Sequence, residues 1–460
     1  MRRTKIICTI GPASSKPAVL KQMIKAGMNV ARLNFSHGTH EEHAGYIKMI
    51  REIAAELGKT VAILQDLQGP KIRVGALPTT GLVLKNGQTI HFSPRAKEYD
   101  ETERLIPVSY GGFSRDVKAG DRILIDDGLL VCVVDRVLNQ VVSATVKVGG
   151  LMTSHKGVNL PDSSVRLSTL TAKDQKDVAF GVREEVDFMV LSFVSAADDI
   201  KKLRDLVERE EHRQEKRGVP IQIVAKIERA DAIRRMDEII KEADAVMVGR
   251  GDLGVEIPEE EVPLRQKEIA RAARCAGKPV IVATQMLESM KENPRATRAE
   301  VSDVANAVID HADAVMLSAE SATGKYPVKA VETLARVAEK TEESVFDDLR
   351  PDELCFDKTD KEFAKQIRLA GKGNGLDGIV TGLQYGNLAS AISRHRPETP
   401  MFVAASEPRE LAQLVLRWGV VPFSMKKARG ADVFERSARE ALEEFGYLNK
   451  KSRLLFLTKD

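Results

Sequence analysis

Short apolar runs alternate with amphipathic segments along most of the chain. The runs have the length of buried strands, and the segments between them repeat apolar residues with helical spacing. Eight such runs occur, at 5–10, 30–34, 61–66, 188–192, 221–226, 245–248, 280–284 and 314–317. Because alternating strands and helices are typical of parallel sheets, eight such units predict an α/β fold built on a (β/α)8 barrel.

A long segment with a different pattern of apolar and turn residues separates the third and fourth runs. Residues 70–166 contain short β-like runs and turns rich in Gly and Asp, such as Asp126-Asp127-Gly128. This pattern predicts an inserted β-rich domain, a β-barrel that covers the mouth of the (β/α)8 barrel as a lid, with a passive decoration as the alternative. Residues 1–69 and 167–345 are thereby assigned to the barrel.

A polar, Asp-rich connection over 347–360 predicts a second boundary. Beyond it, strands at 378–381, 401–405, 420–423 and 454–457 alternate with helices at 363–371, 388–394, 407–416 and 431–445. This alternation predicts a small open α/β domain over 346–460, in the place of a regulatory or oligomerisation domain.

Composition narrows the class of protein. The 460 residues are 43% hydrophobic and 30% charged, with a net charge of +3, which suits a soluble multidomain protein and gives no case for nucleic acid binding. The apolar stretch after Met1-Arg2-Arg3 is too short for a signal peptide, so we expect none, and no run reaches membrane-spanning length. The four cysteines are far apart and form no CxxC pair. We therefore expect neither a disulfide nor a zinc site, and a cytoplasmic location.

The predicted strands end in polar residues: Asn34, Asp66, Ser192, Lys226, Asp252, Thr284 and Ser318. In a barrel these ends meet on one rim, which is where active sites are built. Each residue alone could begin a loop or cap a helix. Seven of them from different strands on one rim indicate a functional site.

The centre of this rim carries the equipment for handling phosphate. Lys226 and Glu228 close one strand, and the turn Arg250-Gly251-Asp252 closes the next. Two carboxylates can hold a hard divalent cation, and a lysine beside them adds a point charge. The turn can offer backbone amides to an anion.

Several long blocks resemble the pyruvate kinase family. They are KIICTIGPAS from Lys5, MNVARLNFSHG from Met28, KGVNLP from Lys156, MVGRGDLGVEIP from Met247 and ATQMLESM from Ala283. The resemblance implies transfer of the phosphoryl group of phosphoenolpyruvate to ADP, giving pyruvate and ATP. It also implies the barrel, the inserted lid and, more loosely, the C-terminal domain.

The resemblance assigns roles to the central residues. Glu228 and Asp252 match the ligands of Mg²⁺ (or Mn²⁺), and Lys226 matches the lysine that stabilises the phosphoryl group in flight. A structural ion pair with Glu228 is the alternative for Lys226. Gly251 and Asp252 match the turn that holds the substrate carboxylate, and Thr284 matches the threonine near the methylene carbon of the substrate. Gly249 replaces the more usual alanine, with little expected consequence.

Other matches are more peripheral. Ser318 and Glu320 follow the last strand, where the family relays a proton to the enolate, although a water chain could do the same. Contacts to phosphate and nucleotide are implied for the basic side chains Arg32, His37, Arg73 and Lys156. A structural or surface histidine is the alternative for His37.

The clearest departure from the family lies at its potassium site. Four residues match the potassium ligands, namely Asn34, Ser36, Asp66 and Leu67 through its carbonyl. The segment that follows has Lys71 where the family has a glutamate. A lysine ammonium could supply the positive charge that potassium otherwise brings. We therefore expect activity without K⁺, with an inconsequential surface lysine as the alternative.

The C-terminal domain gives weaker signals. The stretch 383–388 lacks the hydroxyl cluster and basic residues with which family members hold fructose bisphosphate, so we do not expect that effector. Arg394, His395 and Arg396 could bind another anion or form a helix C-terminal charge cluster. The family resemblance implies an allosteric homotetramer. Two other classes stay open: a metal-dependent aldolase or lyase, which would not require ADP, and a catalytically silent relative of the same fold.

Overall fold

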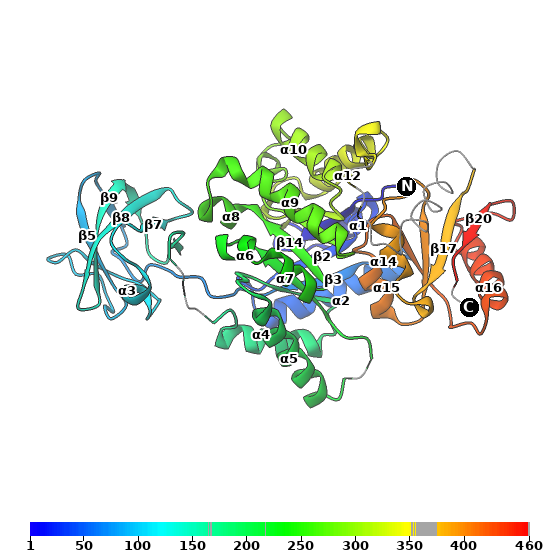
Figure 1. Cartoon of the computed structure of the whole chain (residues 1–460), viewed down its shortest axis with the longest axis horizontal. Helices are drawn as coiled ribbons and strands as arrows, with labels where there is room; N and C mark the ends of the chain where they lie inside the picture. Colours follow the sequence, from blue (N-terminus) through cyan, green and yellow to red (C-terminus); the bar gives the residue numbers. More distant parts are fainter. Residues whose placement is uncertain are drawn as a thin grey trace.

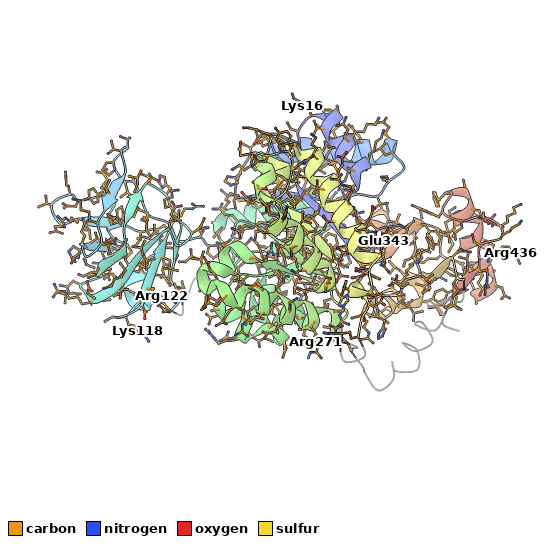
Figure 2. All side chains as sticks on the ribbon, turned by 90° about the horizontal axis from the view of Figure 1, so that it is seen from above. Lys16, Lys118, Arg122, Arg271, Glu343 and Arg436 are labelled. Carbon is orange, nitrogen blue, oxygen red and sulfur yellow. A yellow bond between two sulfur atoms is a disulfide. The ribbon has the colours of Figure 1, made fainter. Side chains whose placement is uncertain are left out.

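The chain is described from a computed structural model, which covers residues 1–163, 165, 168–216, 218–350, 353, 355 and 375–458. Three bodies lie in a row along the long axis, with the barrel between the inserted domain and the C-terminal domain (Figure 1). The view from above shows the same order, with Lys118 and Arg122 at one end and Arg436 at the other (Figure 2). The predicted fold class is confirmed.

Eight parallel strands form a closed barrel in the order β1-β16-β15-β14-β13-β12-β3-β2. Their bounds are β1 (Lys5–Thr9), β2 (Val30–Asn34), β3 (Ala62–Asp66), β12 (Phe188–Leu191), β13 (Gln222–Ile227), β14 (Ala245–Gly249), β15 (Val280–Ala283) and β16 (Ala314–Leu317). Nearly every residue in them is buried, because side chains of one face fill the barrel and those of the other pack against helices. Each of the eight predicted runs is one of these strands.

Helices cover the outside of the barrel. They are α1 (Pro17–Ala26), α2 (His40–Glu56), α4 (Ala172–Arg183), α5 (Ala197–Arg213), α6 (Ala230–Arg234), α7 (Met236–Glu242), α8 (Arg250–Glu256), α9 (Val262–Cys275), α10 (Arg298–Ile309), α11 (Ala319–Ala322) and α12 (Pro327–Glu342). Three of them begin with reciprocal capping boxes, at Thr39, Thr171 and Thr297. Each box satisfies backbone N–H groups that the helix leaves unpaired, so the start of the helix is encoded locally.

The inserted domain is a β structure with its own apolar core. A six-stranded sheet has the order β11-β7-β8-β9-β5-β6, and β10 pairs with β4. The elements are β4 (Leu82–Leu84), β5 (Thr89–Ser93), β6 (Leu105–Pro107), α3 (Phe113–Asp116), β7 (Arg122–Ile125), β8 (Leu130–Leu138), β9 (Val141–Val148), β10 (Gly150–Met152) and β11 (Val158–Asn159). The predicted boundary between 166 and 167 falls on residues outside the described ranges.

The C-terminal domain is an open sheet of four parallel strands in the order β19-β18-β17-β20. Its elements are β17 (Gly378–Gly382), α14 (Leu388–Ser393), β18 (Met401–Ala405), α15 (Pro408–Leu414), β19 (Val420–Ser424), α16 (Ala431–Glu444) and β20 (Leu454–Phe456). The helix expected at 363–371 lies outside the described residues.

This domain packs against the amino ends of the barrel strands. The Arg396 guanidinium donates to both carboxylate oxygens of Asp313, at 3.0 and 2.9 Å, and its side chain is only 3% exposed. The backbone N–H of Trp418 donates to the same carboxylate at 2.9 Å. Buried Lys5 donates to the carbonyl of Val420 at 2.7 Å. Arg394, His395 and Arg396 were considered above as an anion site. Arg396 holds the C-terminal domain to the barrel through Asp313.

A disulfide joins Cys275, the last residue of α9, to Cys355. The expectation that the chain has no disulfide is therefore wrong. The two cysteines are 80 residues apart, so no spacing motif announces the bond, and only the fold brings the end of α9 beside the chain leaving the barrel. Arg274 reinforces this contact by donating to the carbonyl of Glu353 at 2.6 Å.

The two remaining cysteines, Cys8 and Cys132, are buried free thiols. None of the helices in the described ranges is long and apolar enough to cross a membrane.

Candidate active site

Lys226 and Glu228 form an ion pair at the carboxyl end of β13. Lys226 Nζ lies 2.6 Å from Glu228 Oε1, and the two side chains are 11% and 1% exposed. Burial alone would lower the pKa of Lys226, but the carboxylates of Glu228, Asp66 and Asp252 outweigh it and raise that pKa. The lysine is therefore a fixed positive charge on the rim of the barrel.

Asp252, in the first turn of α8, brings a second carboxylate to this pair. Burial raises the pKa of Glu228 to about 7, against the effect of Lys226, and the charge of Asp252 adds to the rise. Two buried carboxylates whose negative charge is only partly balanced by a nearby lysine suit a divalent cation. Among the described residues, no three His, Cys, Asp or Glu side chains gather as a metal site. Mg²⁺ commonly uses one or two carboxylates and completes its shell with substrate oxygens and water, so two carboxylates fit it.

Lys71 extends from the segment after β3 towards the same carboxylate. Its Nζ lies 3.3 Å from Asp252 Oδ1 and 3.7 Å from Asp127 Oδ1 of the inserted domain. Burial opposes ionisation of Asp252, but Lys71 and Lys226 outweigh burial and lower its pKa. A Cβ at Gly157 would lie 2.7 Å from Lys71 Cε, so the glycine makes room for the lysine stem. Lys71 thus places a cation between the lid and the rim.

The turn Gly251-Asp252 faces Thr284, which follows β15. The backbone N–H of Gly251 donates to Thr284 Oγ1 at 2.9 Å, and that hydroxyl donates to the carbonyl of Ala283 at 2.6 Å. Gly251 and Thr284 are therefore neighbours. The first was expected to hold the substrate carboxylate with its amide, and the second to lie near the reacting carbon. An anion at the Gly251 N–H would lie beside the Thr284 hydroxyl.

Gly249, at the end of β14, leaves room for the side chain of Glu228. A Cβ at this position would lie 2.7 Å from Glu228 Cγ and 2.8 Å from Glu228 Oε1, closer than side chains approach. An alanine here therefore requires Glu228 to move. The glycine lets that carboxylate pack directly on the end of β14.

The residues that match potassium ligands meet at the ends of β2 and β3, where Asn34 pairs in register with Asp66. Asn34 Oδ1 accepts from the backbone N–H of Ser36 at 3.1 Å. The carbonyl of Leu67 accepts from Ser192 Oγ at 2.8 Å. The oxygens of Asn34, Leu67 and Asp66 in this set thus already have hydrogen-bond donors within the chain.

Arg32 is buried beside this set. Its Nε donates to Asp66 Oδ2 at 2.7 Å, and its Nη1 donates to Thr9 Oγ1 at 2.8 Å. The guanidinium is therefore already held in place at the rim, with part of its charge balanced by Asp66.

Glu320 is fully buried, and both of its oxygens accept from the backbone. Oε1 accepts from the N–H of Leu287 at 3.0 Å, and Oε2 accepts from the N–H of Ser318 at 2.7 Å. Burial raises the pKa of this carboxyl group. Glu320 thus ties the turn after β15 to the turn after β16, which is a bracing role.

Two of the remaining predicted contacts, Arg73 and Lys156, lie on the connections to the lid, and the third, His37, follows β2. Arg73 Nη1 donates to the carbonyl of His155 at 2.9 Å, and Lys156 Nζ lies 2.9 Å from Asp126 Oδ1. His37 lies in the exposed loop after β2, and its carbonyl is 2.9 Å from His43 Nε2. Arg73 and Lys156 thus stand on the two segments that join the lid to the barrel, with their charges directed at lid atoms.

Sequence reasoning missed several residues of the site. Asp126 and Asp127 were visible only as a turn of the inserted domain, yet they pair with Lys156 and Lys71. Arg250 was noted only as part of a turn, yet its guanidinium contacts the backbone after β15 and the Asp303 side chain. A lysine or arginine beside a turn gives no signal of which acidic partner it will meet.

Two known domain families match the chain over most of its length. The profile "Pyruvate kinase, barrel domain" matches residues 1–331, and "Pyruvate kinase, alpha/beta domain" matches 364–460. The chain belongs to the pyruvate kinase family. Members of this family transfer the phosphoryl group of phosphoenolpyruvate to ADP, giving pyruvate and ATP in glycolysis, and the chain is a phosphotransferase of this kind.

Curated relatives support the assignment over most of the chain. The pyruvate kinase of Sporosarcina psychrophila is 42% identical over 453 residues, covering 96% of this chain and 75% of the relative. That of Geobacillus stearothermophilus is 44% identical over 425 residues, covering 91% and 71%. A solved pyruvate kinase from Cryptosporidium parvum superposes with a TM-score of 0.91 at 32% identity, covering 100% of this chain and 94% of the other.

Proposed function

We propose that this pyruvate kinase requires Mg²⁺ (or Mn²⁺), held by Glu228 and Asp252, and works without K⁺. The observation that carries the proposal is the cluster in which Lys226, Glu228, Asp252 and Lys71 interact on one rim of the barrel. Phosphoryl transfer depends on positioning and charge neutralisation more than on covalent help. When bound, the divalent cation neutralises charge on the substrate phosphates.

The side chains of this cluster have complementary tasks. Lys226, oriented by Glu228 at 2.6 Å, stabilises the negative charge of the phosphoryl group during its transfer. The amides of Gly251 and Asp252 orient the substrate carboxylate. Thr284 lies next to Gly251 and would therefore be near the methylene carbon that receives a proton.

Protonation of the enolate is assigned to the region of Ser318. Because both Glu320 oxygens accept backbone N–H bonds, we propose that Glu320 holds the turn and that the proton arrives at Ser318 by way of water. Arg32 would contact the substrate phosphate. Arg73, His37 and Lys156 would contact the nucleotide when the lid closes.

Lys71 supports the proposed independence from potassium. Its ammonium lies 3.3 Å from Asp252, so a positive charge already stands beside the metal ligands. The oxygens of Asn34, Ser36, Asp66 and Leu67 would then need no monovalent cation for catalysis. The alternative of an inconsequential surface lysine is disfavoured because the Lys71 side chain is 24% exposed and paired with two carboxylates.

We further propose a cytoplasmic homotetramer whose C-terminal domain is allosteric but does not respond to fructose bisphosphate. The cytoplasm is where glycolytic substrates are found, and the cysteine argument for it no longer applies because of the disulfide. Light scattering of the purified protein, with and without fructose bisphosphate and alongside activity, would test the oligomer and the effector together.

The decisive experiment is pyruvate formation from phosphoenolpyruvate and ADP in potassium-free buffer containing Mg²⁺, repeated with added K⁺ and with Mg²⁺ chelated. Equal rates with and without K⁺, and no rate after chelation, are expected. A strong requirement for K⁺ would remove the role assigned to Lys71. Turnover that does not depend on ADP would favour an aldolase or lyase, and no turnover at all would favour a silent relative.

A further inference from the structure

The turn after β15 has backbone φ angles that its two residues rarely adopt. Thr284 has φ +68° and Gln285 has φ +55°, so two consecutive residues with side chains lie in the left-handed region. For a β-branched threonine this conformation is a genuine outlier, and it persists only where surrounding contacts impose it. The contacts that hold this turn therefore decide where the Thr284 hydroxyl lies.

The guanidinium of Arg250 supplies those contacts from the start of α8. Its Nη2 donates to the carbonyl of Thr284 at 2.6 Å, and its Nε donates to the carbonyl of Ala283 at 3.3 Å. Its Nη1 donates to Asp303 Oδ1 on α10 at 2.7 Å. The side chain is 10% exposed, so water competes little with these bonds.

The fork of an arginine suits this task. Donors on three nitrogens of one rigid plane reach two successive carbonyls and a carboxylate, whereas a lysine offers its donors from a single point. The next residue, Gly251, donates its N–H to Thr284 Oγ1 at 2.9 Å. Arg250 thus fixes the backbone of Thr284, and the Gly251 N–H holds its hydroxyl until the substrate carboxylate takes that N–H.

We propose that Arg250, anchored by Asp303, is a positioning residue that holds Thr284 in its left-handed conformation with the hydroxyl towards the reacting carbon. The proposal rests on the role assigned to Thr284 under the proposed function. Arg250 acts through Thr284, and its contribution falls on the step in which the methylene carbon gains or loses a proton.

The test uses the full-length enzyme and the variants Arg250→Gln, Arg250→Lys, Asp303→Asn and Thr284→Ala. Arg265→Gln on α9 is the matched control, because the ion pairs that Arg265 makes with described residues, to Glu261 and Glu268, lie on the surface. For each variant, kcat and KM for both substrates, thermal unfolding, and deuterium exchange into the methyl group of pyruvate in D2O with Mg²⁺ and ATP are measured.

Arg250→Gln is expected to lower kcat and methyl exchange together by about 30-fold or more, with KM for ADP within about twofold and a midpoint of unfolding close to that of the wild type. For Arg250→Lys and Asp303→Asn, kcat and methyl exchange are expected to lie between the values of Arg250→Gln and the wild type. Arg265→Gln is expected to match the wild type. In the Thr284→Ala background, Arg250→Gln should add less than about twofold, because both changes remove the same contribution.

Two results would overturn the proposal. One is an Arg250→Gln enzyme within about threefold of the wild type. The other is full multiplication of the two effects in the double variant, which would show that Arg250 acts independently of Thr284. If Arg250→Gln does not fold, Arg250→Lys and Asp303→Asn carry the same comparison. An unaffected Thr284→Ala enzyme would instead count against the role proposed for Thr284.

Discussion

Lys71 and Asp252 are ion-paired across the mouth of the barrel, with 3.3 Å between Nζ and Oδ1. The pair joins the segment that leads into the lid to a proposed ligand of the divalent cation. It is only partly buried, so its value lies in the charge that it places at the site more than in stability.

Replacing Lys71 by glutamate should create a requirement for potassium. In the Lys71→Glu enzyme a carboxylate would face Asp252, and the missing positive charge would have to come from solution. We expect the rate in potassium-free buffer to fall at least about tenfold and to recover substantially with K⁺. Titration of K⁺ against initial rate measures this, with Na⁺ as the ionic-strength control. A Lys71→Glu enzyme insensitive to K⁺ would contradict the role assigned to the lysine.

Removing the charge of Lys226 should abolish turnover and spare the fold. Lys226→Met keeps most of the side-chain volume, so we expect kcat to fall by at least about a thousandfold. The cost of leaving Glu228 buried without its partner can be relieved by protonation, because its pKa is already raised to about 7. Steady-state kinetics and circular dichroism are the measurements. Lys340→Met, at a side chain that is 84% exposed, is the control and should be silent.

Stability should depend on pH through Asp187, which lies at the amino end of β12. Burial raises the pKa of this carboxyl group to about 7, while its Oδ2 accepts from the N–H of Ile63 at 2.7 Å. Because the folded pKa lies above the unfolded one, the contribution of Asp187 is largest below about pH 4 and is lost as the pH rises to about 7. Each unit of pKa difference corresponds to about 1.4 kcal/mol.

The variant Asp187→Asn keeps an acceptor for Ile63 and cannot ionise. We therefore expect its melting temperature to exceed that of the wild type by a few degrees at pH 7.5, and the advantage to shrink or reverse at pH 4.5. Calorimetry at the two pH values measures this. An advantage that does not change with pH would mean that Asp187 remains charged throughout.

The disulfide between Cys275 and Cys355 should stabilise the junction of the barrel and the C-terminal domain. A cross-link that closes a loop of this length contributes roughly 4 kcal/mol in the chain-entropy description. We expect reduction, or Cys355→Ser, to lower the unfolding temperature, and intact mass under non-reducing conditions to fall by about two hydrogens relative to the reduced chain. Alkylation of four cysteines without reductant, in denaturant, would show that the bond is absent.

The barrel strands could be predicted from the sequence because they are buried on both faces and therefore appear as continuous apolar runs. The position of the site at one rim of the barrel followed from these strands, because the carboxyl ends of parallel strands lie on the same side. Lys226, Glu228 and Asp252 were identified in this way; the structure pairs Lys226 with Glu228 and brings Asp252 close enough for its charge to act on both.

The features of the site that could not be predicted from the sequence depend on contacts between distant segments. The partner of Lys71 on the lid, Asp127, is set by how the inserted domain sits on the barrel. Glu320 shows a different limit, because a buried carboxylate that braces two turns has the same sequence pattern as one that transfers a proton. The partner of Cys275 could not be chosen because its loop spans 80 residues.

The two connections to the lid carry the cations Lys71, Arg73 and Lys156, and Asp127 and Asp126 of the lid lie beside the first and the last of them. A lid that swings on these segments takes its cations along. Closing would bring these cations towards the substrate phosphates, and opening would withdraw them as the products must leave. Substrate capture and product release would then depend on the same movement, and the ionic strength of the medium should alter both.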